Sequence, residues 1–272
     1  MTGRVYAWEV RKLAAQRRTY LGLAAAAVAP VVLVVAIRVR PPQPTDPGSP
    51  FFLRFAVESG LAVPLLMLLF ASVWLFPLVA ALVAGDIVAA EDGNRTLKTI
   101  LTRSAGRTAI FAGKVGAAFT YVLAALLTMV VASVVAGCLA SGFNPLPTFS
   151  TVVSPSRALL LIAGSFAVYA LPALGIAAVA VLFSTISRNS AGAVVGTLLA
   201  ALLMQLTQIL PVLDSDAAQR WMLTAQLQAW QALFRTPLDW GPVVHAAYIS
   251  AAYAVPALVV AWVHFVRRDV SG

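Results

Sequence analysis

Six apolar segments of roughly bilayer-spanning length are the feature that most constrains this 272-residue chain. A transmembrane helix needs about 20 consecutive apolar residues. Hydrophobic residues make up 61% of the chain and charged residues 11%, an apolar excess that no water-soluble core could bury. We therefore predict an all-α integral membrane protein, one transmembrane domain over residues 1–272, with spans at 20–37, 60–84, 115–139, 158–183, 191–213 and 243–266.

The Lys and Arg residues set the expected orientation. With a cytosolic N-terminus, 13 of the 19 Lys and Arg residues lie on the cytosolic side and 6 on the other side. The positive-inside rule then places both termini in the cytosol. The net charge of +9 does not indicate a nucleic-acid partner, because the basic residues flank apolar segments and no basic face is interleaved with aromatic residues. We expect contacts with membrane lipid instead.

The longest charged interruption, residues 85–114, is expected to face the cytosol. Within it, Leu97, Ile100 and Leu101 have the i, i+3, i+4 spacing of one helix face, whereas Lys98 lies off that face. The spacing predicts a short amphipathic helix lying on the membrane surface. Its apolar ridge needs a groove, either among lipid headgroups or on a protein partner.

Two carboxylates, Asp86 and Glu91, lie where the second span meets this charged interruption. One interpretation is a solvated helix end. The other is a cytosolic ion-pair network with Arg95 and Arg107, and both interpretations remain open at this point.

Two more amphipathic surface helices are predicted. The N-terminal one has Tyr6, Val10 and Leu13 at i, i+4, i+7 within a basic segment, as is typical of a helix on the cytosolic surface. The other lies in the last external loop and carries one apolar stripe: Leu223, Leu227, Trp230 and Phe234. We predict that this stripe packs inward over the external end of the pathway as a cap; the alternative is that it rests on lipid headgroups. Trp221, Trp230 and Trp240 are expected at interfacial depth.

The search for catalytic and cofactor sites is negative. Residues 106–115 resemble a phosphate loop, but that motif is G-x-x-x-x-G-K-[ST], and Thr108 and Val115 stand where it needs a glycine and a hydroxyl. His245 and His264 are expected at opposite ends of one helix, so they cannot share a metal ion. Cys138 is the one cysteine, which excludes an intramolecular disulfide and a CxxC site. We predict no enzyme activity, cofactor or metal in this chain.

One small-residue motif, Gly192 and Gly196 in GAVVG, permits close helix packing in the fifth span. The pattern is weak in a chain this rich in alanine and glycine.

The charged interruption resembles the signature of the type-2 ABC-transporter permease family, roughly E-x-x-x-G-T-L, then L-L-x-x-P-x-[ST]-R, then G-K. Glu91 and Thr96-Leu97 match its first part, Ile100-Leu101 and Arg107 the second, and Gly113-Lys114 the last. Arg95 and Ser104 depart from the usual Gly and Pro. The N-terminal E-x-x-K of Glu9 and Lys12 and the six-span plan are also similar to the family.

The resemblance implies the permease subunit of a bacterial ABC exporter in the cytoplasmic membrane. Its partners would be an ABC ATP-binding subunit, which carries the ATP and Mg, and a second permease copy or related chain. The coupling helix that contacts the ATPase would contain Glu91, Arg95, Leu97, Lys98, Ile100, Leu101 and Arg107, with Arg107 paired to Glu91 or Asp86.

The apolar lining and the lack of an intramembrane charge pair favour a lipophilic or amphipathic cargo, such as a drug, antibiotic or lipid, over a bare ion. The alternatives are a permease for an ion or copper-related system, a non-transporting membrane scaffold or sensor, and a membrane-embedded enzyme. Cargo identity, direction of transport and homodimer versus heterodimer stay open.

Overall fold

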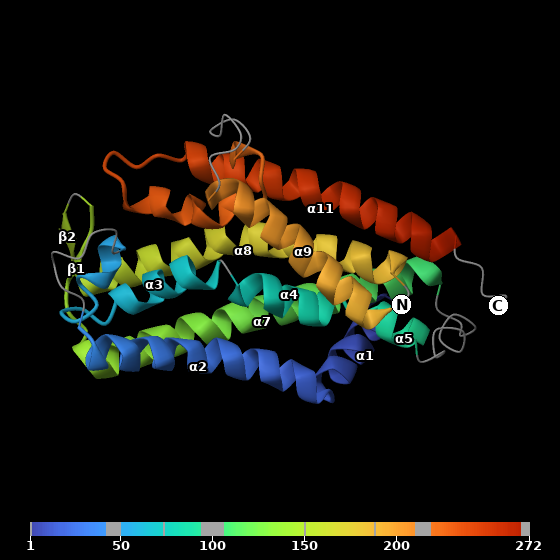
Figure 1. The fold of residues 1–272 in the computed structure, drawn as a ribbon, viewed down its shortest axis with the longest axis horizontal. Helices are drawn as coiled ribbons and strands as arrows, with labels where there is room; N and C mark the ends of the chain where they lie inside the picture. Colours follow the sequence, from blue (N-terminus) through green and yellow to red (C-terminus); the bar gives the residue numbers. More distant parts are fainter. Residues whose placement is uncertain are drawn as a thin grey trace.

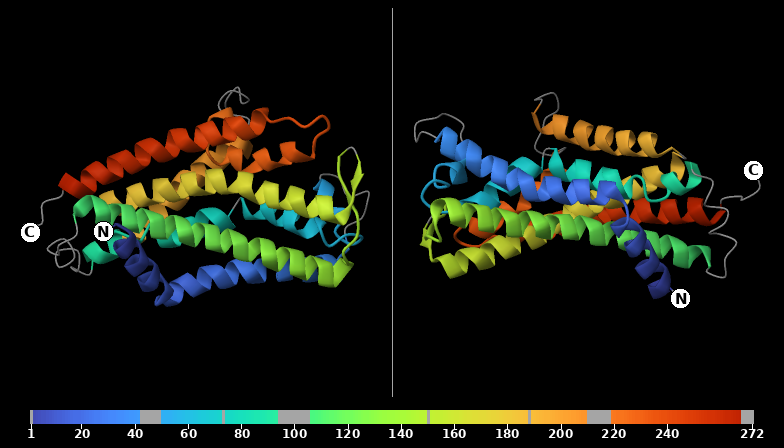
Figure 2. Two further views of the ribbon diagram at one scale, coloured as in Figure 1. Left: turned by 180° about the vertical axis from the view of Figure 1, so that it is seen from behind. Right: turned by 90° about the horizontal axis from the view of Figure 1, so that it is seen from below.

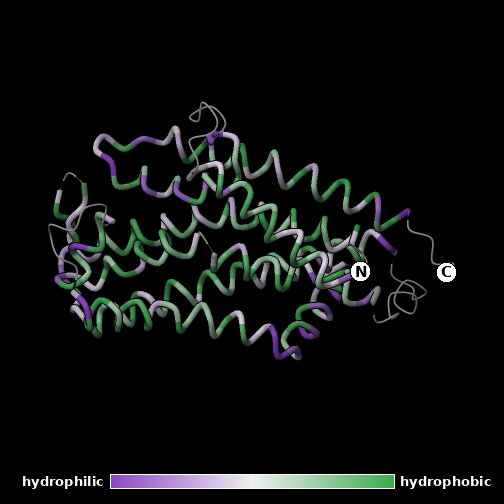
Figure 3. Tube along the Cα trace, in the orientation of Figure 1, coloured by the Kyte–Doolittle hydropathy of each residue, from purple (hydrophilic) through white to green (hydrophobic). Residues whose placement is uncertain are grey.

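The computed structural model describes residues 2–41, 50–72, 74–93, 106–149, 151–187, 189–209 and 219–267. Its long helices lie side by side along one axis (Figure 1), and hydrophilic stretches gather towards the two ends of the bundle (Figure 3). The helices in chain order are α1 (Thr2–Ala14), α2 (Arg17–Val39), η1 (Phe51–Leu53), α3 (Ala62–Ala71), α4 (Leu75–Ala84), α5 (Ala89–Gly93), α7 (Arg107–Ser141), α8 (Pro155–Ile186), α9 (Ser190–Ile209), η2 (Ala225–Phe234) and α11 (Gly241–Arg267).

Five of the described helices are long and apolar enough to cross a membrane: α2, α7, α8, α9 and α11. The pair α3 and α4 passes the same criteria when taken together, which gives up to six spans. Within the described residues the only strands are β1 (Leu146–Pro147) and β2 (Val152–Val153), paired antiparallel. The prediction of an all-α, multi-pass membrane protein is therefore confirmed.

The second span, predicted over residues 60–84 with possible kinks at Pro64 and Pro77, is broken into two helices. Helices α3 and α4 meet at 62°. Pro77 is the third residue of α4, where a proline is tolerated because N–H groups in the first turn lack helical acceptors. The same proline cannot continue a helix from the preceding turn, so the chain restarts there.

The third span is longer than predicted, because α7 has 35 residues and begins at Arg107. The second part of the charged interruption, from Arg107 to Lys114, is therefore the first two turns of a helix and not a loop. Helix α7 ends at Ser141, and the next residue, Gly142, has the positive φ of 81° and the N–H bond to the Cys138 carbonyl that are typical of a glycine that terminates a helix.

The predicted external surface helix is instead a 3-10 helix packed inside the bundle. Helix η2 lies against α8 and α11. Leu223, just before η2, contacts α8 at Gly175, and Leu233 contacts it at Gly164. Those glycines are eleven residues apart, about 16 Å along a helix, so this segment runs alongside α8. Trp230 is fully buried.

The two ends of the bundle differ in content (Figures 1 and 2). At one end, called here the α1 end, lie α1, α5, the start of α7 and the end of α11. At the other, the hairpin end, lie η1 and the β1–β2 hairpin. The N-terminus and the last described turn of α11 thus share an end, as an even number of spans requires.

Candidate functional site

A fully buried lysine is the centre of a charged cluster at the α1 end. Lys114 of α7 is 0% exposed, and its Nζ lies 2.8 Å from Glu9 Oε1 of α1 and 2.6 Å from Glu91 Oε1 of α5. Glu91 also pairs with Lys12 of α1. Two carboxylates and two ammonium groups, here called the Lys114 cluster, therefore balance within one contact network.

Because the ion pairs of the Lys114 cluster are buried, each charged group needs its particular partner. An uncompensated ion in a low-dielectric interior costs several kcal/mol, so each charge requires its partners in place. Glu9 and Glu91 are 1% and 2% exposed, and neither can turn to water without moving its helix. The Lys114 cluster consequently fixes α1, α5 and α7 relative to one another.

Close packing of α1 on α7 brings the cluster together. A Cβ at Gly113 would lie 2.8 Å from Val5 Cγ1, so only glycine lets the two backbones approach this closely. Beside it, the Tyr6 hydroxyl lies 2.8 Å from Thr120 Oγ1. The predicted N-terminal amphipathic helix is confirmed, and its apolar face rests on α7.

A second ion pair, with a buried carboxylate and a half-buried guanidinium, lies at the same end. Asp86, 1% exposed, follows α4 and pairs with Arg18 in the first turn of α2, and it also accepts a hydrogen bond from Ser190 at the start of α9. Nearby, the Ser184 hydroxyl of α8 accepts hydrogen bonds from the N–H groups of Val88 and Ala89, both at 3.0 Å. Helices α2, α8 and α9 are thereby tied to the segment that leads into α5.

Asp86 and Glu91 form ion pairs rather than a solvated helix end, and the partners that the structure describes include Arg18, Lys12 and Lys114. The predicted partner Arg95 lies outside the described residues. Arg107 donates a 2.6 Å hydrogen bond from Nη1 to the carbonyl of Val266, which ties the start of α7 to the end of α11. Lys114 itself belongs to the second turn of α7, at the α1 end of the bundle.

The remaining members of the predicted coupling helix lie outside the described residues: Arg95, Leu97, Lys98, Ile100 and Leu101. Their docking role stays a prediction. The flanks of that segment, α5 and the first turn of α7, are described, and both carry residues of the α1 end.

The four residues of the predicted cap are all buried: Leu223, Leu227, Trp230 and Phe234. The rings of Trp230 and Phe234 lie against Phe52 of η1 in tilted and edge-to-face arrangements, at centroid distances of 6.1 and 5.4 Å. The stripe therefore faces protein, inside the hairpin half of the bundle.

The buried small-residue face of α9 lies one position beyond the predicted glycines. Gly192 is exposed and lies closest to Ser187, while Gly196 packs against the ring of Phe183. The enclosed stripe is instead Ala193, Thr197 and Ala201, at i, i+4 and i+8. Small residues still form this contact, as expected for membrane helices.

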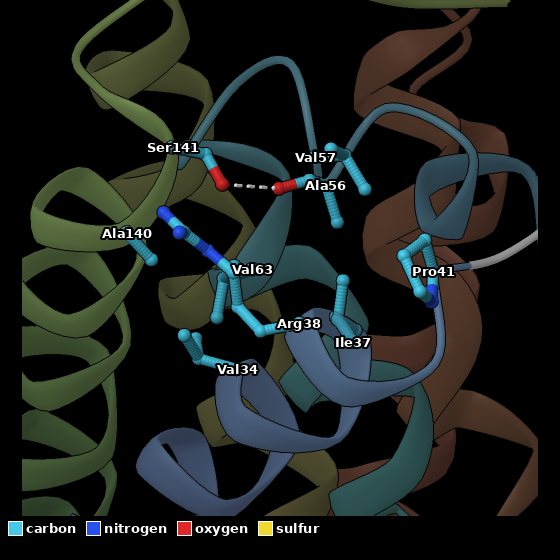
Figure 4. A pocket seen from close by; sticks show the side chains of 9 residues that line it. All are labelled: Val34, Ile37, Arg38, Pro41, Ala56, Val57, Val63, Ala140 and Ser141. Carbon is cyan, nitrogen blue, oxygen red and sulfur yellow. Dashed lines mark hydrogen bonds between the residues drawn. The ribbon is translucent and has the colours of Figure 1, made fainter.

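An apolar groove of about 660 Å³ runs between α2 and α7 in the hairpin half, lined by valine, alanine and leucine side chains with Arg38 at its end. Figure 4 shows a smaller cavity there, of about 50 Å³, with the Arg38 side chain extending towards Ala140 and Ser141. In the described part of the chain, no three His, Cys, Asp or Glu side chains lie close enough to hold a metal ion.

Fold and cluster together define a multi-pass α-helical membrane protein whose charged interruption is tied into its helices. Over residues 6–203 the chain matches the ABC-2 family transporter protein family, and it belongs to that family. It is thus a membrane permease component of an ABC transporter, which implies a partner ATP-binding subunit. No curated protein matches the chain.

The predicted resemblance is confirmed by this match. The structure also shows why scattered motif residues belong together, because Glu9, Lys12, Glu91 and Gly113-Lys114 meet in one cluster. The family match runs from α1 through most of α9, and η2 and α11 follow it.

Proposed function

We propose that the chain is the permease subunit of a bacterial exporter of lipophilic or amphipathic small molecules, working beside a second permease chain in the cytoplasmic membrane. A separate subunit hydrolyses ATP and docks at the α1 end, which faces the cytosol by the Lys and Arg bias. The observation that carries the proposal is the Lys114 cluster, which joins both flanks of the predicted coupling helix to α1.

A coupling element transmits force only if it is rigidly attached to the spans that must move. Residues 94–105 connect α5 to α7, and Glu91 and Lys114, one on each side, are paired at 2.6 Å. Motion of the ATPase against this segment would therefore move α5, α7 and α1 as one body. The Asp86–Arg18 pair extends the same attachment to α2.

The cargo class follows from where charge is placed. The ion pairs of Lys114, Glu91, Glu9, Lys12, Asp86 and Arg18 lie at the α1 end. The helices α3 and α4 and the helix η2 contain no charged residue. A bare ion would need polar or charged groups along its route, so an uncharged or amphipathic molecule suits this bundle better.

Docking is tested by copurifying the permease with its ATPase in mild detergent. Leu101→Asp places a charge on the predicted apolar ridge and should abolish ATPase copurification and transport while the chain inserts at normal levels. Thr102→Asp, next in sequence but off the ridge, is the matched control and should retain both. Full ATPase association and transport in the Leu101 variant would overturn the coupling-helix proposal, and a stable wild-type chain that recruits no ATPase would favour a scaffold or sensor.

A further inference from the structure

An arginine lies at one end of the apolar groove between α2 and α7. The groove has a volume of about 660 Å³, and every residue that lines it, apart from Arg38, is valine, alanine or leucine. This volume is within the range of about 300–1,000 Å³ that is usual for small-molecule sites. The side chain of Arg38 extends from α2 towards Ala140 and Ser141 at the end of α7 (Figure 4). A single cation therefore marks the end of the groove that lies at the hairpin end of the bundle.

The groove has the length and direction of a lipid chain in one leaflet. Arg38 is the last residue but one of α2, and on this helix the lining reaches back to Val31. On α7 the lining reaches from Ala140 back to Ala132. At 1.5 Å per residue these stretches are about 10–12 Å long. They cover most of one hydrocarbon leaflet, which is about 15 Å deep in a bilayer core of about 30 Å. The charged end thus lies near headgroup level, and the apolar lining extends from it towards the bilayer centre.

The Arg38 guanidinium has no partner in the part of the chain that the structure describes. No ion pair and no hydrogen bond to it are made there. A guanidinium has five N–H donors and matches a phosphate with two parallel hydrogen bonds. Basic groups between membrane helices are a known means of recognising anionic headgroups. The charge and the lining together are therefore complementary to a lipid phosphate with an acyl chain beneath it.

A second copy of this chain fits the groove less well. In a symmetric dimer the same surface of both chains meets, so the Arg38 side chains of the two copies would share one interface. Helices α2 and α7 contain no Asp or Glu that could pair with them. Covering the groove in this way would bury two like charges without a counter-ion, which costs several kcal/mol per ion. A lipid supplies the missing negative charge.

We propose that this groove binds an anionic phospholipid of the outer leaflet, the leaflet at the hairpin end. The lipid phosphate accepts hydrogen bonds from Arg38, and one acyl chain lies between α2 and α7 along Val35, Ala136 and Leu139. The site is separate from the Lys114 cluster and from any cargo. The bound lipid joins the ends of α2 and α7, and it neutralises an arginine that these two helices leave without a carboxylate.

Labelling by a photoreactive lipid tests the site. The probe is phosphatidylglycerol with a diazirine on one acyl chain, added at a low fraction to phosphatidylcholine liposomes that hold the permease–ATPase complex. Labels should concentrate on residues 31–39 and 132–140, mapped by mass spectrometry. Excess unlabelled phosphatidylglycerol should compete, whereas inorganic phosphate should not. Arg38→Gln should reduce the labelling several-fold. Arg157→Gln, which removes an exposed arginine in the first turn of α8, is the matched control and should leave it unchanged.

A second variant keeps Arg38 and fills the groove. Ala136→Phe places a ring among the lining residues and should reduce the labelling several-fold, whereas Ala251→Phe, at an exposed position of α11, should not. ATPase copurification, measured on the same samples, shows which variants are folded and reports separately on the proposed exporter function.

Three results would overturn the lipid site. One is labelling spread evenly over the exposed helix faces, which would indicate bulk lipid only. Another is groove labelling that persists in a folded Arg38→Gln or Ala136→Phe variant. The third is a disulfide between two chains in the Leu139→Cys variant, made in a Cys138→Ala background, since it would show that a second copy covers the groove.

Discussion

The α1 end and the hairpin end hold the same helices together by different means. At the α1 end the contacts are buried ion pairs around Lys114 and Asp86. At the hairpin end they are aromatic stacking and backbone hydrogen bonds: Phe52 contacts Phe51, Phe149, Trp230 and Phe234. Neither end relies on helix-to-helix burial alone, which supplies little driving force in lipid.

Backbone contacts are prominent at the hairpin end. Gly60 N–H donates to the Gly142 carbonyl at 3.1 Å, and a Cβ on Gly60 or Gly137 would overlap the backbone of the other. Asn144 Nδ2 donates to the Glu58 carbonyl at 2.8 Å. Side-chain identity matters less for such contacts than shape.

The difference teaches that each end constrains a different kind of motion. Apolar and aromatic contacts tolerate small sliding, because dispersion has no strict direction and a shifted ring finds new neighbours. A buried ion pair tolerates little, because separating it leaves charge in a low-dielectric interior. The α1 end is therefore the rigid end, which suits the place where an ATPase would push.

The largest expected effect is the loss of Lys114. Lys114→Met leaves Glu9 and Glu91 without their shared cation and should lower the free energy of unfolding in detergent by about 3–5 kcal/mol. Lys12→Met removes the other partner of Glu91, but its side chain is 33% exposed, so the loss should be only about 1 kcal/mol. Equal losses in the two variants would show that burial of Lys114 does not set the rigidity of this end.

A smaller effect is expected at the hairpin end. Leu227→Ala removes a fully buried side chain of η2 and should lower the free energy of unfolding by about 2 kcal/mol, the lower end of the range for this change, because lipid replaces water in the reference state. Leu238→Ala, 46% exposed in the loop after η2, serves as the control and should change it little. If Leu227→Ala lowered the free energy of unfolding by more than Lys114→Met does, the comparison between the two ends of the bundle would be reversed.

The smallest of the three effects concerns the hydrogen bonds that join α8 to the start of α5. Ser184→Ala leaves the N–H groups of Val88 and Ala89 without their acceptor and should lower the free energy of unfolding by about 1 kcal/mol. Hydrogen–deuterium exchange at residues 88–91 should rise with it. Ser156→Ala, exposed in the first turn of α8, should leave both measurements unchanged, and equal exchange in the two variants would contradict the role of Ser184.

Most of the fold could be predicted from sequence, because span length and apolar composition follow directly from bilayer thickness. That the residues of the Lys114 cluster meet was not predicted from the sequence, although two features of the sequence indicate it. Glu9 lies three residues after Tyr6 and four before Leu13, on the apolar face of α1. Lys114 lies four residues after Ile110 and three before Ala117, on the buried face of α7. A charge in the middle of an apolar face indicates a partner elsewhere.

The break in the second span and the path of η2 could not be predicted in the same way. Each segment is apolar at helical spacing, and that pattern is the same for a straight span, a bent pair or a helix re-entering the bundle. Pro77 could mark a kink but not its 62° size. The path of η2 depends on Gly175 and Gly164 of α8, whose missing side chains leave room for Leu223 and Leu233.

The Lys114 cluster also bears on how the chain is made. Glu9, Lys12 and Glu91 all precede Lys114 in sequence, so each carboxylate partner has left the ribosome before the lysine enters the membrane. The charge of α7 can be neutralised as soon as that helix inserts, without α8, α9 or α11. The first half of the protein can thus settle as an assembled unit while the second half is still being synthesised, and deletion of α1 should impair insertion of a helix that begins about 90 residues later.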